Sequence, residues 1–178
     1  MATKKTSMFT LTERLTITAN ATPTFATIDL GSYVDVGDRQ ALQIHSVDFI
    51  YQGTTAAEAM QVTYSGDSES KIQLTDLNRG GLVFSNDRAL VASGQLNFDT
   101  GTNQLSSDAD LYPDNFGKGA DDGRYVVNDQ LYITGLTGGL NTGASKALNV
   151  TVRVNASIVS LSAKDFMAIA IQSTAADN

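Results

Sequence analysis

His45 is the only histidine of the chain and the first place to look for catalysis, because imidazole is the commonest general base. It lies in the segment Gln43-Ile-His-Ser-Val-Asp-Phe, where it shares the parity of Val47 and Phe49 along an expected strand. A histidine in that setting is more often packed in a core or an interface than catalytic. No partner pattern accompanies it, so we predict neither a catalytic triad nor a metal site at His45.

Acidic residues gather in one stretch and could bind calcium. Asp108, Asp110 and Asp114 lie close together, and Asp121-Asp122-Gly123 follows. Calcium prefers such oxygen ligands, but the glycine and the terminal bidentate glutamate of an EF-hand loop are missing. We interpret these residues as solvated acids of turns, with calcium at Asp108, Asp110 and Asp114 as the alternative. We predict no cofactor and no small-molecule substrate.

The composition disfavours several other functions. The net charge of −7 opposes contact with phosphate backbones, so we expect no direct nucleic-acid binding. The absence of tryptophan and the 7% aromatic content disfavour the clefts of glycosidases and carbohydrate-binding modules. The chain has no cysteine for disulfides or zinc, no glycine-rich phosphate motif and no apolar run long enough for a transmembrane segment. We therefore predict that it is not an enzyme.

Two long segments alternate apolar and polar residues with the period of a β-strand. In the segment 9–19 the apolar side chains share one parity, and Glu13 is the exception. In the segment 148–158 the alternation has no exception. Strands of this length are typical of sandwiches built from two facing sheets.

Shorter segments complete a single domain over residues 1–178. Further strands are expected at 25–30, 41–51, 60–64, 71–77 and 124–136, with short edge pieces at 81–84 and 95–98. Pro23 marks a turn that predicts a hairpin between the first two strands. Roughly eight strands with turn signals between them predict an all-β, antiparallel two-sheet sandwich of the jelly-roll type.

Helices and flexible ends are expected at four places. A short helix is predicted over 86–93 after an asparagine cap. Ser162-Ala-Lys-Asp165 resembles a second cap, and the apolar run 166–171 after it is either a buried helix or a last strand. Residues 1–7, with Lys4 and Lys5, are expected to form a flexible arm, and residues 174–178 a disordered tail.

Apolar residues of both parities occur in the segment 41–51: Leu42, Ile44 and Ile50 on one, and Val47, Phe49 and Tyr51 on the other. This pattern predicts a strand that is covered on both faces, by a second layer or by a neighbouring subunit. Phe49 and Tyr51 are therefore candidates for an interface.

The stretch 99–123 is rich in Gly, Asp, Asn and Ser and is expected to form a long ordered loop. Its apolar residues Leu111, Tyr112 and Phe116 are candidates for contact with a neighbour or partner. The glycine-rich segment 135–143 is expected to be an ordinary connection between strands.

Three stretches carry a resemblance to a known family: 16–31 (TITANATPTFATIDLG), 33–44 (YVDVGDRQALQI) and 47–52 (VDFIYQ). They resemble the single jelly-roll capsid proteins of marine prokaryotic viruses, which tile an icosahedral shell by lateral contacts. The resemblance implies a virion protein, assembled in the host cytoplasm, whose partners are copies of itself and other virion proteins. It brings no catalytic residues. The N-terminal arm is shorter than the genome-binding arms of many RNA-virus coats, which counts against direct genome packaging.

The main alternative is a β-sandwich receptor-binding or adhesin module of a fibre, tail or surface protein, with the stretch 99–123 at the receptor. Assembly separates the two hypotheses. A shell protein should form closed particles or rings, whereas an adhesin should stay monomeric or trimeric.

Overall fold

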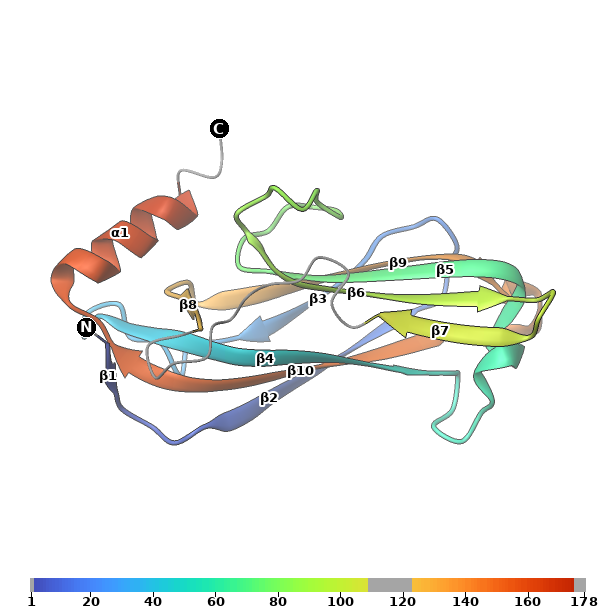
Figure 1. The fold of residues 1–178 in the computed structure, drawn as a ribbon, viewed down its shortest axis with the longest axis horizontal. Helices are drawn as coiled ribbons and strands as arrows, with labels where there is room; N and C mark the ends of the chain where they lie inside the picture. The colour runs from blue at the N-terminus through green and yellow to red at the C-terminus, as the bar shows by residue number, and fades with distance from the viewer. Residues whose placement is uncertain (1, 109–122, 175–178) are drawn as a thin grey trace.

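Two antiparallel sheets pack face to face in the computed structural model, which describes residues 2–108 and 123–174, with side chains up to residue 171 (Figure 1). The first sheet contains β1 (Thr3–Lys4), β2 (Phe9–Ile17), β4 (Gln40–Gln52), β8 (Arg124–Val126) and β10 (Leu148–Ser160). The second contains β3 (Thr24–Asp29), β5 (Tyr64–Thr75), β6 (Leu90–Asp99), β7 (Gln104–Asp108) and β9 (Gln130–Leu140). The helices are η1 (Met60–Thr63), η2 (Thr142–Ala144) and α1 (Ala163–Thr174).

The strand order is that of a jelly roll. The main strands are arranged β2-β10-β4-β8 in the first sheet and β3-β9-β5-β6 in the second. Counted along the chain without β1 and β7, these orders are 1-8-3-6 and 2-7-4-5, which is the double Greek key of that fold. β1 extends the first sheet beside β10, and β7 extends the second beside β6. The predicted fold class is confirmed.

The predicted hairpin between the first two strands is wrong, because β2 and β3 lie in different sheets. Asn20, in the connection between them, accepts a hydrogen bond from the amide of Leu140 at 2.7 Å and donates one to its carbonyl at 3.0 Å. The connection is thereby fixed to the end of β9. A turn signal such as Pro23 marks where the chain bends, but it does not specify which strand comes next in the sheet.

A β-bulge explains the two parities of the segment 41–51. Ile44 pairs with Ala156 and Ser46 pairs with Asn155, so His45 is one extra residue in β4. One inserted residue reverses the side-chain alternation, and both Ile44 and Phe49 therefore point into the core between the sheets. The predicted cover on both faces is correct at the start of β4, where Ala41 lies in a second apolar cluster with Phe166 of α1.

β1 and α1 lie at the same end of the sandwich (Figure 1), where Ala2 packs against the cluster that contains Phe166. Residues 1–7 are not a flexible arm throughout, because Thr3 and Lys4 pair with Ser160 and Val159. The apolar run after Ser162 is a helix, and its first turn is capped: the amide of Asp165 donates to Ser162 Oγ at 3.2 Å. The predicted disordered tail begins at the last residue of α1 and otherwise lies outside the described residues.

Five further expectations, all within residues 81–143, are wrong in whole or in part. Residues 86–93 are not a helix, since β6 begins at Leu90, and 95–98 lies inside that strand between β5 and β7. The segment 81–84 is not a strand, and most of the glycine-rich segment 135–143 belongs to β9. The expected long loop 99–123 begins as a hairpin, because β7 pairs with β6 over Gln104–Asp108.

Candidate functional site

His45 is held by the sheet and is not arranged for catalysis. Its Nε2 lies 2.9 Å from Oγ of Ser157, which resembles a nucleophile and its base. Ser157 is fully buried, so no substrate carbonyl can reach its hydroxyl. Burial lowers the pKa of His45, and the positive charge of Lys4 lowers it further, which keeps the imidazole neutral near pH 7. His45 is the extra residue of the β-bulge, and its side chain is held by the contact with Ser157.

The other predicted site residues are only partly described. Asp110, Leu111, Tyr112, Asp114 and Phe116 lie outside the described residues. Asp108 is the last residue of β7. Within the residues that the structure describes, no group of three His, Cys, Asp or Glu side chains is placed to hold a metal ion.

The two interface candidates on β4 face inward. Phe49 is buried in the core, and Tyr51 packs against the same cluster. An added Cβ at Gly94 of β6 would lie 2.8 Å from both the Phe49 ring and the Tyr51 hydroxyl. These two aromatic residues therefore contact the opposite sheet of their own subunit.

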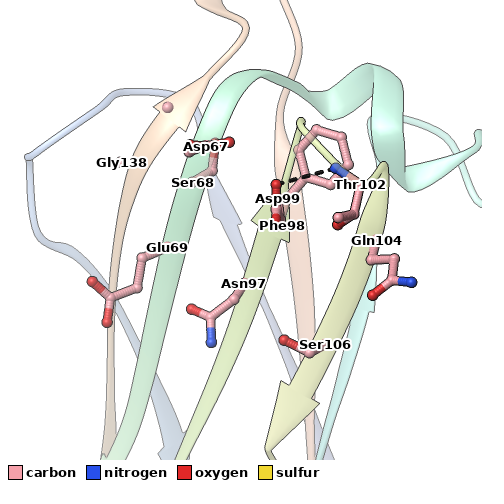
Figure 2. A pocket seen from close by; sticks show the side chains of 11 residues that line it. Asp67, Ser68, Glu69, Asn97, Phe98, Asp99, Thr102, Gln104, Ser106 and Gly138 are labelled. Atoms are coloured by element: carbon pink, nitrogen blue, oxygen red, sulfur yellow. Dashed lines mark hydrogen bonds between the residues drawn. The ribbon is translucent and has the colours of Figure 1, made fainter.

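A shallow groove of about 760 Å³ lies on the outer face of the second sheet, across β5, β6 and β7 (Figure 2). Most of the residues that line it are of polar types, among them Asp67, Glu69, Asn97, Asp99 and Gln104. Asp67 accepts a hydrogen bond from the backbone N–H of Thr100 in the β6–β7 turn. Asp99 accepts hydrogen bonds from the next two N–H groups, of residues 101 and 102. Phe98, the aromatic residue of the lining, is buried, so the carboxylates and amides are the groups that can hydrogen-bond a hydroxylated or cationic ligand.

A partly buried ion pair joins the two sheets at one edge, and the sequence analysis missed it. Asp76, just after β5, lies 2.9 Å from Nη2 of Arg124 on β8. Arg124 also donates hydrogen bonds to the carbonyls of Arg88 and Leu90. Burial raises the pKa of Asp76, and the hydrogen bond from Arg124 opposes that rise. The two residues are 48 positions apart, and neither belongs to a local motif that could have predicted the contact.

The loop between β5 and β6 folds over the second sheet and exposes one aromatic side chain. Val83 accepts a hydrogen bond from the Gln73 amide at 2.9 Å through its carbonyl and donates one to Gln73 at 2.7 Å through its N–H. The next residue, Phe84, is 86% exposed. A phenyl ring held in water by an anchored loop is a candidate contact for another molecule.

Further apolar side chains are exposed at the end of the sandwich that carries β1 and α1. Met8 and Val36 are more than half exposed, and Tyr33 stacks on Phe9 with ring centroids 5.3 Å apart. Met167 and Ile171 form an exposed stripe on α1, because residues four apart share a helix face. The amide of Leu161 donates to the carbonyl of Arg39 at 3.0 Å, which fixes α1 beside the loop that carries Tyr33 and Val36.

The strand order defines a jelly-roll fold. No protein-family model and no curated protein matches the sequence. Among solved structures the chain is similar to Merkel cell polyomavirus VP1 in complex with GD1a oligosaccharide, with 8% identity, a TM-score of 0.41 and coverage of 90% of this chain and 98% of that one. It is also similar to the Merkel cell polyomavirus virus-like particle, with 9% identity, a TM-score of 0.37 and coverage of 85% and 74%. No helix among the described residues is long and apolar enough to span a membrane.

Proposed function

We propose that this chain is a capsid protein of a marine prokaryotic virus, whose copies assemble by lateral contacts into an icosahedral shell in the host cytoplasm. The observation that carries the proposal is the strand order β2-β10-β4-β8 over β3-β9-β5-β6. This arrangement is used in viral capsids, because two Greek keys give a compact, rigid block. The resemblance of the segments 16–31, 33–44 and 47–52 to such proteins points the same way.

The outer face of the first sheet suits a subunit that packs against others. Uncharged side chains form hydrogen-bonded rows across its strands: Thr10 donates to Asn155 at 2.7 Å, and Asn155 donates to Ser46 at 2.9 Å. Thr16 donates to Asn149 at 2.8 Å in a second row. Because these side chains hold one another in place, such a face loses little conformational entropy when it is covered.

A subunit contact also needs apolar surface that is stabilised by burial, and the exposed apolar residues at the end that carries β1 and α1 provide it. Met8, Val36, Met167 and Ile171 come from three separate segments of the chain. Protein interfaces usually combine an apolar centre with a polar rim, and the two kinds of surface are both present here. We propose that this end and Phe84 contribute to contacts with copies of the chain or with other virion proteins.

We also propose that the protein is structural and has no catalytic activity, no small-molecule substrate and no direct contact with nucleic acid. The pair His45–Ser157 is closed to substrates by the burial of Ser157. The net charge of −7 opposes binding to a genome.

A receptor-binding or adhesin module is the second candidate, and the groove of Figure 2 favours it. Amides and carboxylates on an open sheet face could hydrogen-bond a hydroxylated receptor. In that case the protein would remain a monomer or trimer, and substitution of Asn97 or Gln104 by Ala would abolish receptor binding without changing the oligomeric state.

The two candidates are separated by imaging and mass measurement of the purified full chain over a range of concentrations and salt. We expect closed particles or ring-shaped oligomers in negative-stain images, with masses that are multiples of 18.9 kDa. A protein that stays monomeric at the highest soluble concentration would contradict the capsid proposal.

A further inference from the structure

The four sheet edges differ in how they are protected against pairing with another chain. An exposed edge strand presents free N–H and C=O groups, and proteins block such edges with inward charges, prolines or very short strands. In the first sheet, β2 points Glu13 toward the inner face opposite Val152, and β8 has three residues. In the second sheet, Pro23 directly precedes β3.

β7, the other edge of the second sheet, has none of these devices. All five of its residues, Gln104–Asp108, are exposed. It pairs with β6 in an unbroken register, and within the described residues it pairs with no other strand. It contains no proline, lysine or glycine, and its one charged residue, Asp108, is the last.

The inward side of β7 is incomplete as well. Leu105 pairs with Phe98, whose side chain is buried in the core, yet Leu105 is still 37% exposed. A further strand beside β7 would cover this leucine and continue the apolar layer. As far as the described residues show, the backbone over 104–107 and the side chain of Leu105 can therefore make further contacts in the direction away from β6.

We propose that β7 pairs antiparallel with β7 of a second copy of the chain, about a twofold axis at Ser106. The second sheets of the two subunits would then form one continuous sheet. In this register Ser106 faces the partner's Ser106, Leu105 faces the partner's Ser107, and Gln104 faces the partner's Asp108. The contact deepens the proposed function, on which it rests for the identity of the partner.

The sequence of β7 is self-complementary, which favours a second copy over an unrelated protein. An antiparallel pair about Ser106 places no two like charges opposite each other, because Asp108 meets the amide of Gln104. Leu105 of each subunit lies beside a small serine, so the two leucines can approach across the axis. Pairs of this kind satisfy the isologous geometry of a twofold contact.

A single introduced cysteine tests the register, since the chain has no cysteine of its own. Directly opposite residues of antiparallel strands have Cβ atoms about 4.5–5.5 Å apart, close to the reach of a disulfide. With copper–phenanthroline as the oxidant, two thiols lose two electrons and two protons and form the bond. We expect Ser106→Cys to give a covalent dimer on non-reducing gels. Thr27→Cys, exposed on the opposite edge strand β3, measures random collisions and should stay monomeric.

A charge exchange tests the pairing without any covalent bond. Gln104→Asp places like charges opposite each other at two symmetric positions and should raise the dimer dissociation constant about tenfold. Gln104→Lys should lower it by a similar factor. Because Gln104 also pairs with Asp99 in its own subunit, the double variant Gln104→Asp with Asp108→Lys is the control. Recovery of association in the double variant, measured by sedimentation equilibrium, places the effect between subunits.

The outcomes separate this contact from the proposed function. Particles or rings without a Ser106 cross-link and without a charge effect would overturn the β7 pairing and leave the capsid proposal standing. A cross-linked dimer that forms no larger species would support the pairing and count against the shell. A chain that is monomeric in every experiment would overturn both.

Discussion

The inner faces of the two sheets differ in the size of their side chains. In the first sheet the inward residues are mostly large, as with Leu15 and Ile17 of β2. In the second sheet several inward positions are small, and Gly135 of β9 lies directly against that pair: a Cβ there would be 2.4 Å from Leu15 Cδ2 and 2.8 Å from Ile17 Cδ1. Gly94 of β6 leaves space for the Phe49 ring in the same way, because a Cβ there would lie 2.8 Å from that ring. The core is therefore formed by large side chains of one sheet in spaces left by the other.

The second sheet also satisfies its own polar residues inside the core. Ser70 of β5 lies 2.9 Å from the hydroxyl of Tyr64 and 2.6 Å from that of Thr137, and all three residues are buried. The ring of Tyr64 stacks on Phe98 with centroids 5.8 Å apart. Small hydroxyl residues can thus occupy inward positions because they form a closed hydrogen-bonded group.

The largest effect is expected from shortening a large side chain of the first sheet. Ile17→Ala removes atoms from a fully buried site and should lower the free energy of unfolding by about 2–5 kcal/mol. Thr12→Ala on the exposed face of the same strand should change it by no more than about 0.5 kcal/mol. Urea unfolding followed by circular dichroism measures both. Equal effects at the two positions would contradict the assignment of the inner face.

Enlarging a small residue of the second sheet should have the next largest effect. Gly135→Ala should lower the free energy of unfolding by about 1–3 kcal/mol, because its Cβ would overlap side chains of β2. Gly138→Ala in the same strand is the matched control, since the nearest atom to its Cβ is 4.0 Å away; it should be neutral or stabilising by up to about 1 kcal/mol. A Leu15→Ala background should reduce the cost of Gly135→Ala, and purely additive effects would argue against the contact.

This difference between the sheets also explains what could be predicted from the sequence. The alternation of β2 and β10 was visible because their inward residues are large and apolar. In β9 the glycines from 135 onward gave the composition of a loop. In β4 the extra residue His45 put apolar side chains on both parities, which is also the pattern of a strand covered on both faces. The Asp76–Arg124 pair and the open edge at β7 depend on which strands become neighbours. Local pattern does not contain that information, so the fold class was predictable while the candidate contacts were not.

The ion pair between the sheets should show itself in the pH dependence of stability. Because burial raises the folded-state pKa of Asp76, the folded protein binds this proton more tightly than the unfolded chain does. The contribution of Asp76 to stability is therefore greatest below the ordinary carboxyl pKa and decreases as the pH rises through the folded-state pKa. Asp76→Asn should remove this decrease. Because Arg124 is 31% exposed and keeps its hydrogen bonds to the carbonyls of Arg88 and Leu90, stability near pH 7 should change by no more than about 1 kcal/mol.

Asp67 in the groove is a control, because its contribution to stability should change with pH in the opposite direction. Hydrogen bonds from Thr100 lower the pKa of Asp67, so its contribution is present above the ordinary pKa and is lost as the pH falls. Unfolding curves from about pH 2 to 8 for Asp76→Asn and Asp67→Asn compare the two slopes, because the Asp67 contribution is lost below its ordinary pKa. If the slopes change in the same direction, Asp76 is not buried as described.

The smallest effect is expected for removal of the buried hydroxyl of Tyr51, a large inward residue of the first sheet. The Tyr51 hydroxyl is buried against Gly94 and has no hydrogen-bond partner among the described residues. Burial raises the pKa of Tyr51 far above its ordinary value, so the hydroxyl stays protonated at any physiological pH. Tyr51→Phe keeps the ring and removes the unsatisfied oxygen, and should leave the free energy of unfolding unchanged or raise it by up to about 1 kcal/mol. Thermal unfolding of the variant measures this change. A decrease in the free energy of unfolding by about 1 kcal/mol would mean that the hydroxyl has a hydrogen-bond partner.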